Sequence, residues 1–122
     1  MKIDIRERTK RFGVNIIVLI RKFPKDIAGQ VMGKQLIRSG TSIGANLEEA
    51  DASPTRNDFF NKVSISYKEA RETRYWLEVV LEAKLFNNPS NVSELKALLA
   101  EAVEISKILY SISRGKNRPK VI

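Results

Sequence analysis

The residue types that most often carry chemistry near neutral pH are missing from this sequence, which contains no histidine and no cysteine. Without them the chain lacks the usual general base, the thiol nucleophile and the soft ligands of transition-metal sites. Serine, aspartate, glutamate and lysine are present, but no phosphate-binding glycine loop, zinc-protease helix, nucleophile elbow or EF-hand loop occurs. The sequence therefore predicts a binding protein rather than an enzyme, with no catalytic residues, no metal and no cofactor.

Positive charge is the chemistry that the side chains do offer. Lysine and arginine number 22 against 14 acidic residues, so the formal net charge is +8. This excess favours a polyanionic partner, and structured RNA or DNA bound through its phosphates is the first hypothesis. Aromatic residues interleaved with the basic ones are sparse, which argues against base stacking. An alternative stays open: the charge only keeps the protein in solution, and the chain is a scaffold that recruits a partner protein.

The basic residues gather near the two ends of the chain. The nucleic-acid-binding candidates are Lys2, Arg6, Arg8, Lys10, Arg11, Arg114, Lys116, Arg118 and Lys120. Acidic residues temper the first group, at Asp4 and Glu7, whereas the last four are unopposed. If the fold brings both chain ends to the same place, the two groups would join into one basic patch.

Prolines divide the chain at nearly even intervals, and apolar residues between them repeat at helical spacing. We predict helices at about 3–22, 25–52, 55–87 and 90–114, which form one domain over 1–114, and a basic tail over 115–122. Ser53, before Pro54, is the expected cap of the third helix, and Ser90 or Asn91 of the fourth. Because the connections are short, we expect an all-α fold, an antiparallel up-down-up-down four-helix bundle.

The expected core follows from heptad spacing in the two middle helices. Helix 25–52 presents Leu36, Gly40, Ile43, Leu47 and Ala50. Helix 55–87 presents Phe59, Val63, Ser66, Ala70, Thr73, Leu77 and Val80. Helix 3–22 has one stripe of Phe12, Ile16, Leu19 and Phe23.

Further apolar residues lie outside these stripes. The subunit-interface candidates are Val14, Ile17, Val18, Tyr75, Val79 and Phe86. In helix 90–114, Ile105, Ile108 and Ile112 point away from Val92, Leu99 and Val103. A small monomeric bundle should be polar on such faces, so they predict a homo-oligomer, with the bundles assembled into a ring.

Polar residues flank the seams of the two middle helices. One flank holds Arg38, Ser42, Asn46 and Glu49, and the other holds Tyr67, Arg71, Arg74 and Glu78. They form either an internal network that fixes helix register or a ligand site. The neighbouring cluster of Glu48, Glu49 and Asp51 is interpreted as a solvated helix end, because adjacent residues point different ways around a helix.

Nothing in the sequence indicates a membrane. The charged first twelve residues have no signal-peptide pattern, and the apolar-rich stretch Val14–Ile20 is too short to cross a bilayer. With no cysteine to form disulfides, the expected location is the cytoplasm.

Two segments resemble a known family. Residues 38–50, RSGTSIGANLEEA, resemble the "RSxxSIxxNxxEG/A" signature of the 23S ribosomal RNA intervening-sequence protein family. Asp58-Phe59-Phe60 and then residues 67–77, YKEARETRYWL, are similar to its second signature; Ala50 stands where many members have glycine. The polar residues that match are Arg38, Asn46, Glu49, Glu69 and Arg71.

The resemblance implies an up-down bundle that assembles as a ring, commonly a homopentamer. The family is also similar to the accessory variability protein of diversity-generating retroelements, a basic pentamer that binds nucleic acid and a reverse transcriptase. By fold-level analogy this implies nucleic acid, and a partner protein, as the classes of partner to consider.

Overall fold

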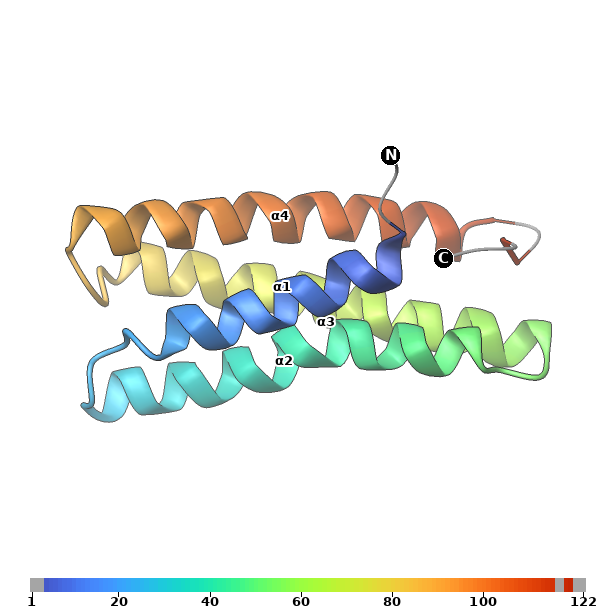
Figure 1. Cartoon of the computed structure of the whole chain (residues 1–122), viewed down its shortest axis with the longest axis horizontal. Helices are drawn as coiled ribbons and strands as arrows, with labels where there is room; N and C mark the ends of the chain where they lie inside the picture. The colour runs from blue at the N-terminus through green and yellow to red at the C-terminus, as the bar shows by residue number, and fades with distance from the viewer. Residues whose placement is uncertain (1–3, 116–117, 120–122) are drawn as a thin grey trace.

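The computed structural model describes residues 4–115 and 118–119. That part of the chain consists of four helices and contains no strand: α1 (Ile5–Ile20), α2 (Ile27–Asp51), α3 (Arg56–Glu82) and α4 (Pro89–Ser113). The helices lie side by side along the long axis of the molecule (Figure 1). The all-α four-helix bundle expected from the sequence is confirmed.

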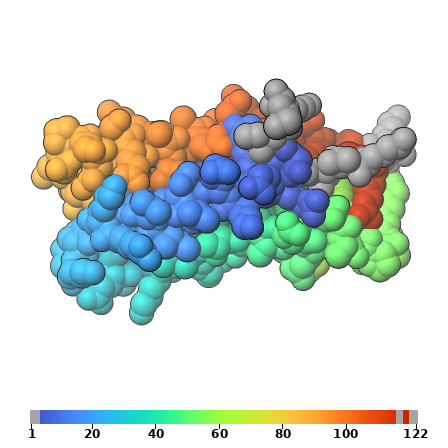
Figure 2. Space-filling view, in the orientation of Figure 1, coloured from blue at the N-terminus to red at the C-terminus, as the bar shows by residue number. Residues whose placement is uncertain are grey.

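Each helix packs against its neighbours in the chain, and α1 also packs against α4. The first turn of α1 contacts the last turn of α2 through Arg6 and Asp51. Figure 1 shows the start of α1 and the end of α4 in the same half of the bundle. In the space-filling view, α1 lies across the face between α2 and α4, so its outer side is open to solvent (Figure 2).

Short polar residues begin every helix by accepting hydrogen bonds from free backbone amides. Thr55 accepts from the Asp58 amide to cap α3, and Asn88 accepts from the amides of the first turn of α4. The caps predicted from sequence were therefore wrong. Pro54 precedes the cap of α3 instead of following it, and Pro89 takes the first helical position behind Asn88.

The third helix ends at Glu82, five residues before the predicted end at 87, whereas the other ends differ by one or two residues. Lys84 has a φ of 53°, and its amide and the Leu85 amide bond back to carbonyls of the last turn. This is a left-handed helix stop, made with a lysine in place of the usual glycine. The stop turns Phe86 back onto the bundle, where its ring lies 5.6 Å from that of Phe23.

The core contains every seam position expected in the two middle helices, as well as the α1 stripe. The expectation for the fourth helix was wrong, because Ile105 is fully buried and Ile108 and Ile112 are half-buried against the core rather than on an outer face. The core face of α4 consists of Leu95, Leu98, Ala102, Ile105 and Leu109. Apolar residues occur nearly all around α4, so their spacing could not select the buried face.

Glycines let α1 lie close against α2. A Cβ atom on Gly40 would be 3.0 Å from the Ile16 side chain, and one on Gly44 would be 3.3 Å from the Thr9 hydroxyl. Contacts this short leave little room for a larger side chain at either position. Gly44 also lines a groove between these two helices.

Candidate nucleic-acid interface

The first basic residue that the structure describes, Arg6, is bound within the fold. Its guanidinium lies 2.9 Å from the Asp51 carboxylate and 3.5 Å from that of Glu48. Lys62 of α3 lies 3.5 Å from Glu49. The three carboxylates end α2, where the helix dipole is already negative, so cations from neighbouring helices stabilise them. The helix end is solvated, as expected from sequence, since the three carboxylates are exposed, and it is also tied to two other helices.

Arg8 is also paired. Two of its nitrogens donate to the Glu101 carboxylate at 2.8 and 2.6 Å, which joins α1 to α4. These bonds raise the pKa of Arg8 above its ordinary value. The bidentate geometry fixes the register of the two helices. Because the Glu101 carboxylate compensates the Arg8 charge, little of that charge is left for a ligand.

Arg118 has a structural role that the sequence did not reveal. Its guanidinium donates to the carbonyls of Ser53 and Asp51 at 2.8 and 2.6 Å, and to that of Ala50 at 3.3 Å. The same group lies 4.6 Å from the centre of the Phe59 ring. Arg118 therefore caps the end of α2, a favourable place for a cation.

The other terminal cations are more available. Lys10 is exposed and makes no ion pair or hydrogen bond with any described residue. Arg11 is 68% exposed, with its nearest carboxylate, Glu7, at 3.8 Å. Arg114 lies over the Tyr110 ring at 5.3 Å. The remaining candidates, Lys2, Lys116 and Lys120, lie outside the described residues.

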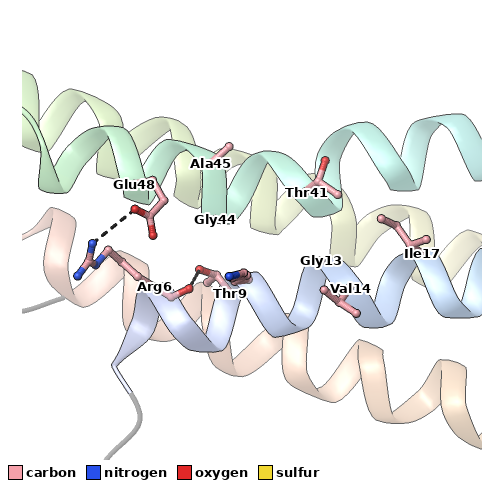
Figure 3. A pocket seen from close by; sticks show the side chains of 10 residues that line it. Arg6, Thr9, Gly13, Val14, Ile17, Thr41, Gly44, Ala45 and Glu48 are labelled. Carbon is pink, nitrogen blue, oxygen red and sulfur yellow. Dashed lines mark hydrogen bonds and ion pairs between the residues drawn. The ribbon is translucent and has the colours of Figure 1, made fainter.

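A groove of about 230 Å³ follows the line where α1 meets α2. Arg6, Thr9, Lys10, Gly13, Val14 and Ile17 line it from α1, and Thr41, Gly44, Ala45 and Glu48 from α2. Figure 3 shows the Arg6–Glu48 ion pair at one end and Val14, Ile17 and Thr41 at the other. The groove is therefore charged at one end and apolar at the other.

The interface candidates divide into two groups. Val14, Ile17, Val18 and Tyr75 are exposed, with Tyr75 at 58%. Val79 is half-buried. Phe86 is also half-buried and packs against the core beside Phe23, so it contributes to the fold of this chain.

The polar residues of the first signature join α2 to α3. Arg38 donates to Glu69 at 3.0 and 3.3 Å and also to Glu72, which in turn accepts from the Trp76 indole at 3.2 Å. The bond from Arg38 lowers the pKa of Glu72, and the same bond raises the pKa of Arg38. The internal network that the sequence allowed is present, although its α3 partners are Glu69 and Glu72, not the flank of Arg74 and Glu78.

The other signature residues act locally or pair elsewhere. Asn46 donates to the Ser42 carbonyl at 2.8 Å within α2, and Glu49 pairs with Lys62. Arg71 lies over the ring of Tyr67 at 5.9 Å. Sequence analysis missed the aromatic contact of Tyr67 with Tyr110. The spacing of four residues between each tyrosine and the arginine after it indicates the two Arg–Tyr contacts, but no local signal indicates a contact between tyrosines of two different helices.

The described part of the chain offers neither a metal-binding cluster nor a membrane-spanning helix. Within residues 4–115 and 118–119, no cluster of three acidic side chains is placed to hold a metal ion. No helix in the same part of the chain is long and apolar enough to cross a membrane.

Four amphipathic helices around one apolar core place the chain in the class of four-helix bundle proteins. Within that class, the family model described as 23S rRNA-intervening sequence protein matches residues 1–111, and the chain belongs to this family. The chain is similar to a crystal structure from Bacteroides thetaiotaomicron, a protein of unknown function from the S23 ribosomal protein family. The identity is 36%, the match covers 91% of this chain and 99% of that one, and the TM-score is 0.79. No curated protein matches the sequence.

Proposed function

We propose that this chain is a non-enzymatic, homo-oligomeric protein that binds nucleic acid, largely through phosphates. The observation that carries the proposal is the excess of positive charge, which ion pairs within the chain cannot neutralise. If each of the 14 carboxylates neutralised one cation, eight of the 22 lysines and arginines would remain. Eight uncompensated cations on a chain this small favour a polyanionic partner.

The family supports the same partner. Its description refers to ribosomal RNA, and the similar Bacteroides protein is assigned to a ribosomal protein family. These names describe the family and the Bacteroides protein, and they support the proposal that this chain binds RNA. The phosphate contacts that we propose are those of Lys10, Arg11 and Arg114, because Arg6, Arg8 and Arg118 are committed to the fold.

A salt titration tests this function. A fluorescently labelled RNA hairpin, followed by anisotropy, should bind at about 50 mM salt and weaken steeply by about 200 mM, because binding releases counterions. The double variant Lys10→Ser, Arg11→Ser should lower the slope of log affinity against log salt by about 1.5, since each lost contact contributes roughly 0.7–0.9.

The matched control is Lys25→Ser, Lys96→Ser, which removes two exposed lysines near the opposite end of the bundle. This control should keep both the slope and most of the affinity. If the unaltered protein fails to bind even at about 50 mM salt, nucleic-acid binding is rejected and the protein-interaction scaffold becomes the better function.

The same proposal includes self-association. Val14 and Tyr75 are 53% and 58% exposed, and they lie on different helices. Apolar residues that stay uncovered on a small bundle are typical of an interface. Two unlike patches favour a head-to-tail contact that closes into a ring, and we propose a homopentamer as the family resemblance implies.

Tyr75→Glu should therefore reduce the molar mass measured by light scattering while the circular dichroism spectrum stays helical. A charge placed in a subunit contact would be desolvated without a partner, which weakens association by several kcal/mol, on the order of 2–5. Ile27→Glu is the control, because Ile27 is 80% exposed and outside the candidate faces. A mass unchanged by Tyr75→Glu would exclude this side of α3 as an interface.

A further inference from the structure

Four side chains from α3 and α4 form a continuous row on the outside of the bundle. The rings of Tyr67 and Tyr110 lie 5.5 Å apart at an angle of 53°. Arg71 lies over Tyr67 at 5.9 Å, and Arg114 lies over Tyr110 at 5.3 Å. We call Arg71, Tyr67, Tyr110 and Arg114 the Arg–Tyr row.

One side of the Arg–Tyr row packs against the core, and the other side faces solvent. Tyr67 is half-buried and packs against the core cluster, so its ring has a fixed support. Tyr110 is 45% exposed, and both arginines are exposed. The row therefore presents aromatic and planar cationic surface to solvent from a rigid pair of helices.

The charges of the row are not neutralised. Neither Arg71 nor Arg114 forms an ion pair with a carboxylate of the described chain, in contrast to Arg6, Arg8 and Arg38. A guanidinium over a ring face makes no hydrogen bond to the ring, so its N–H donors remain available to another acceptor. The two ends of the row can therefore contact phosphates while the rings stay accessible.

A second pair of the same kind extends the surface. Arg56 lies over the ring of Phe60 at 5.1 Å in the first turns of α3. Phe60 precedes Tyr67 by seven residues, which is two helical turns, so the two rings occupy the same side of α3. Aromatic rings paired with arginines thus recur along this side of the bundle.

We infer that the Arg–Tyr row binds unpaired bases of a single-stranded nucleic acid. Bases stack on tyrosine rings and on guanidinium planes, and basic side chains beside them track the phosphates. Bases in a duplex are already stacked on each other, so an exposed tyrosine ring beside arginines selects single-stranded segments. The inference rests on the proposed function and deepens it, since it adds base stacking to the phosphate contacts.

The test compares two probes with the same phosphates. One is a labelled oligouridine of about 12 nucleotides, within the usual site size, and the other is an oligomer of equal length in which every base is removed. The unaltered protein should bind the oligouridine more tightly by about five- to a hundredfold for each stacked base. An oligothymidine of equal length shows whether the row accepts DNA as well as RNA.

Tyr110→Ala should remove most of the preference for the base-bearing oligomer and leave affinity for the abasic one unchanged. Tyr110→Phe keeps the ring and should keep the preference. Ile65→Ala removes an exposed apolar side chain on α3 outside the row and the candidate interface, and should also keep it. Arg114→Lys keeps the charge but loses the plane, so it should lower the preference with an unchanged salt slope.

The outcomes separate this inference from the proposed function. Equal affinity for both oligomers, or a full preference retained by folded Tyr110→Ala, overturns the stacking row while phosphate binding stands. Binding of the RNA hairpin but of neither oligomer at low salt overturns the row alone, and binding of none of the three overturns the proposed function, and the row with it.

Discussion

Ile43→Asp is expected to unfold the bundle. The Ile43 side chain is fully buried, and the carbonyl of the same residue accepts a hydrogen bond from the buried Ser66 hydroxyl at 2.7 Å. An aspartate there would lose the packing of the isoleucine and bring a carboxylate into the core without a cation to pair with. The cost is several kcal/mol, comparable with the whole stability of about 5–15 kcal/mol for a small domain.

Far-UV circular dichroism measures the outcome, and Ile37→Asp is the matched control on the same helix. Ile37 is 41% exposed, so its substitution should change the free energy of unfolding by roughly 0.5 kcal/mol or less. A helical Ile43→Asp variant with a normal urea midpoint would contradict the assignment of Ile43 to the core.

Gly29→Ala is expected to have the second-largest effect. Gly29 is buried in the first turn of α2, where its amide donates to the capping carboxylate of Asp26 at 2.9 Å. A Cβ atom on Gly29 would lie 1.8 Å from the Pro24 carbonyl oxygen, closer than atoms that are not bonded can approach. The turn must move and the cap is lost, so the free energy of unfolding should fall by about 3 kcal/mol or more.

Gly13→Ala is the control for the same chemical change. A Cβ atom on Gly13 would meet its nearest neighbour at 3.6 Å, an ordinary contact, within the middle of α1. Alanine is the better helix former, so this variant should be as stable as the unaltered protein or more stable by up to about 1 kcal/mol. Urea titration of both variants gives the comparison, and equal stabilities would refute the steric argument at Gly29.

The sequence predicted the packing of the two middle helices well because their pattern leaves little choice. In α3 the seven expected seam positions are also the seven buried residues. Apolar and small residues recur there at intervals of three and four, and only one side of a helix can satisfy that spacing. The four-helix class follows from the same regularity. The partners of Arg38 do not, because the sequence left a ligand site open and the structure has Glu69 and Glu72 in place of the expected flank.

The fourth helix shows where periodicity fails. Ile105 and Leu109 are buried, whereas Leu99 and Val103, which are equally apolar, are only partly covered. The buried side of α4 is chosen by contact with α3 and α1, and that contact is not encoded in the spacing of α4 alone. The end of α3 at Glu82 could not be predicted from spacing either. It goes with a contact between Phe86 and Phe23, which are far apart in the sequence.

The candidate interface changed most between sequence and structure. Nine cations near the chain ends were candidates, the last four of them with no acidic neighbour in sequence, yet Arg8 binds Glu101, and Arg118 binds carbonyls near Ser53. Such partners lie far apart along the chain, beyond the reach of any local rule. The pairing of Tyr67 with Tyr110 joins α3 to α4 in the same way.

The sequence by itself determined the all-helical bundle, its family and the excess of positive charge, since periodicity and composition are properties of the chain. Only the tertiary structure decided which cations stay free, because an ion pair or a stacked ring depends on distance in space. For this protein, the structure leaves Lys10, Arg11 and Arg114 as the available candidates of the basic ends, and the row that we infer adds the outer side of α3 and α4 to them.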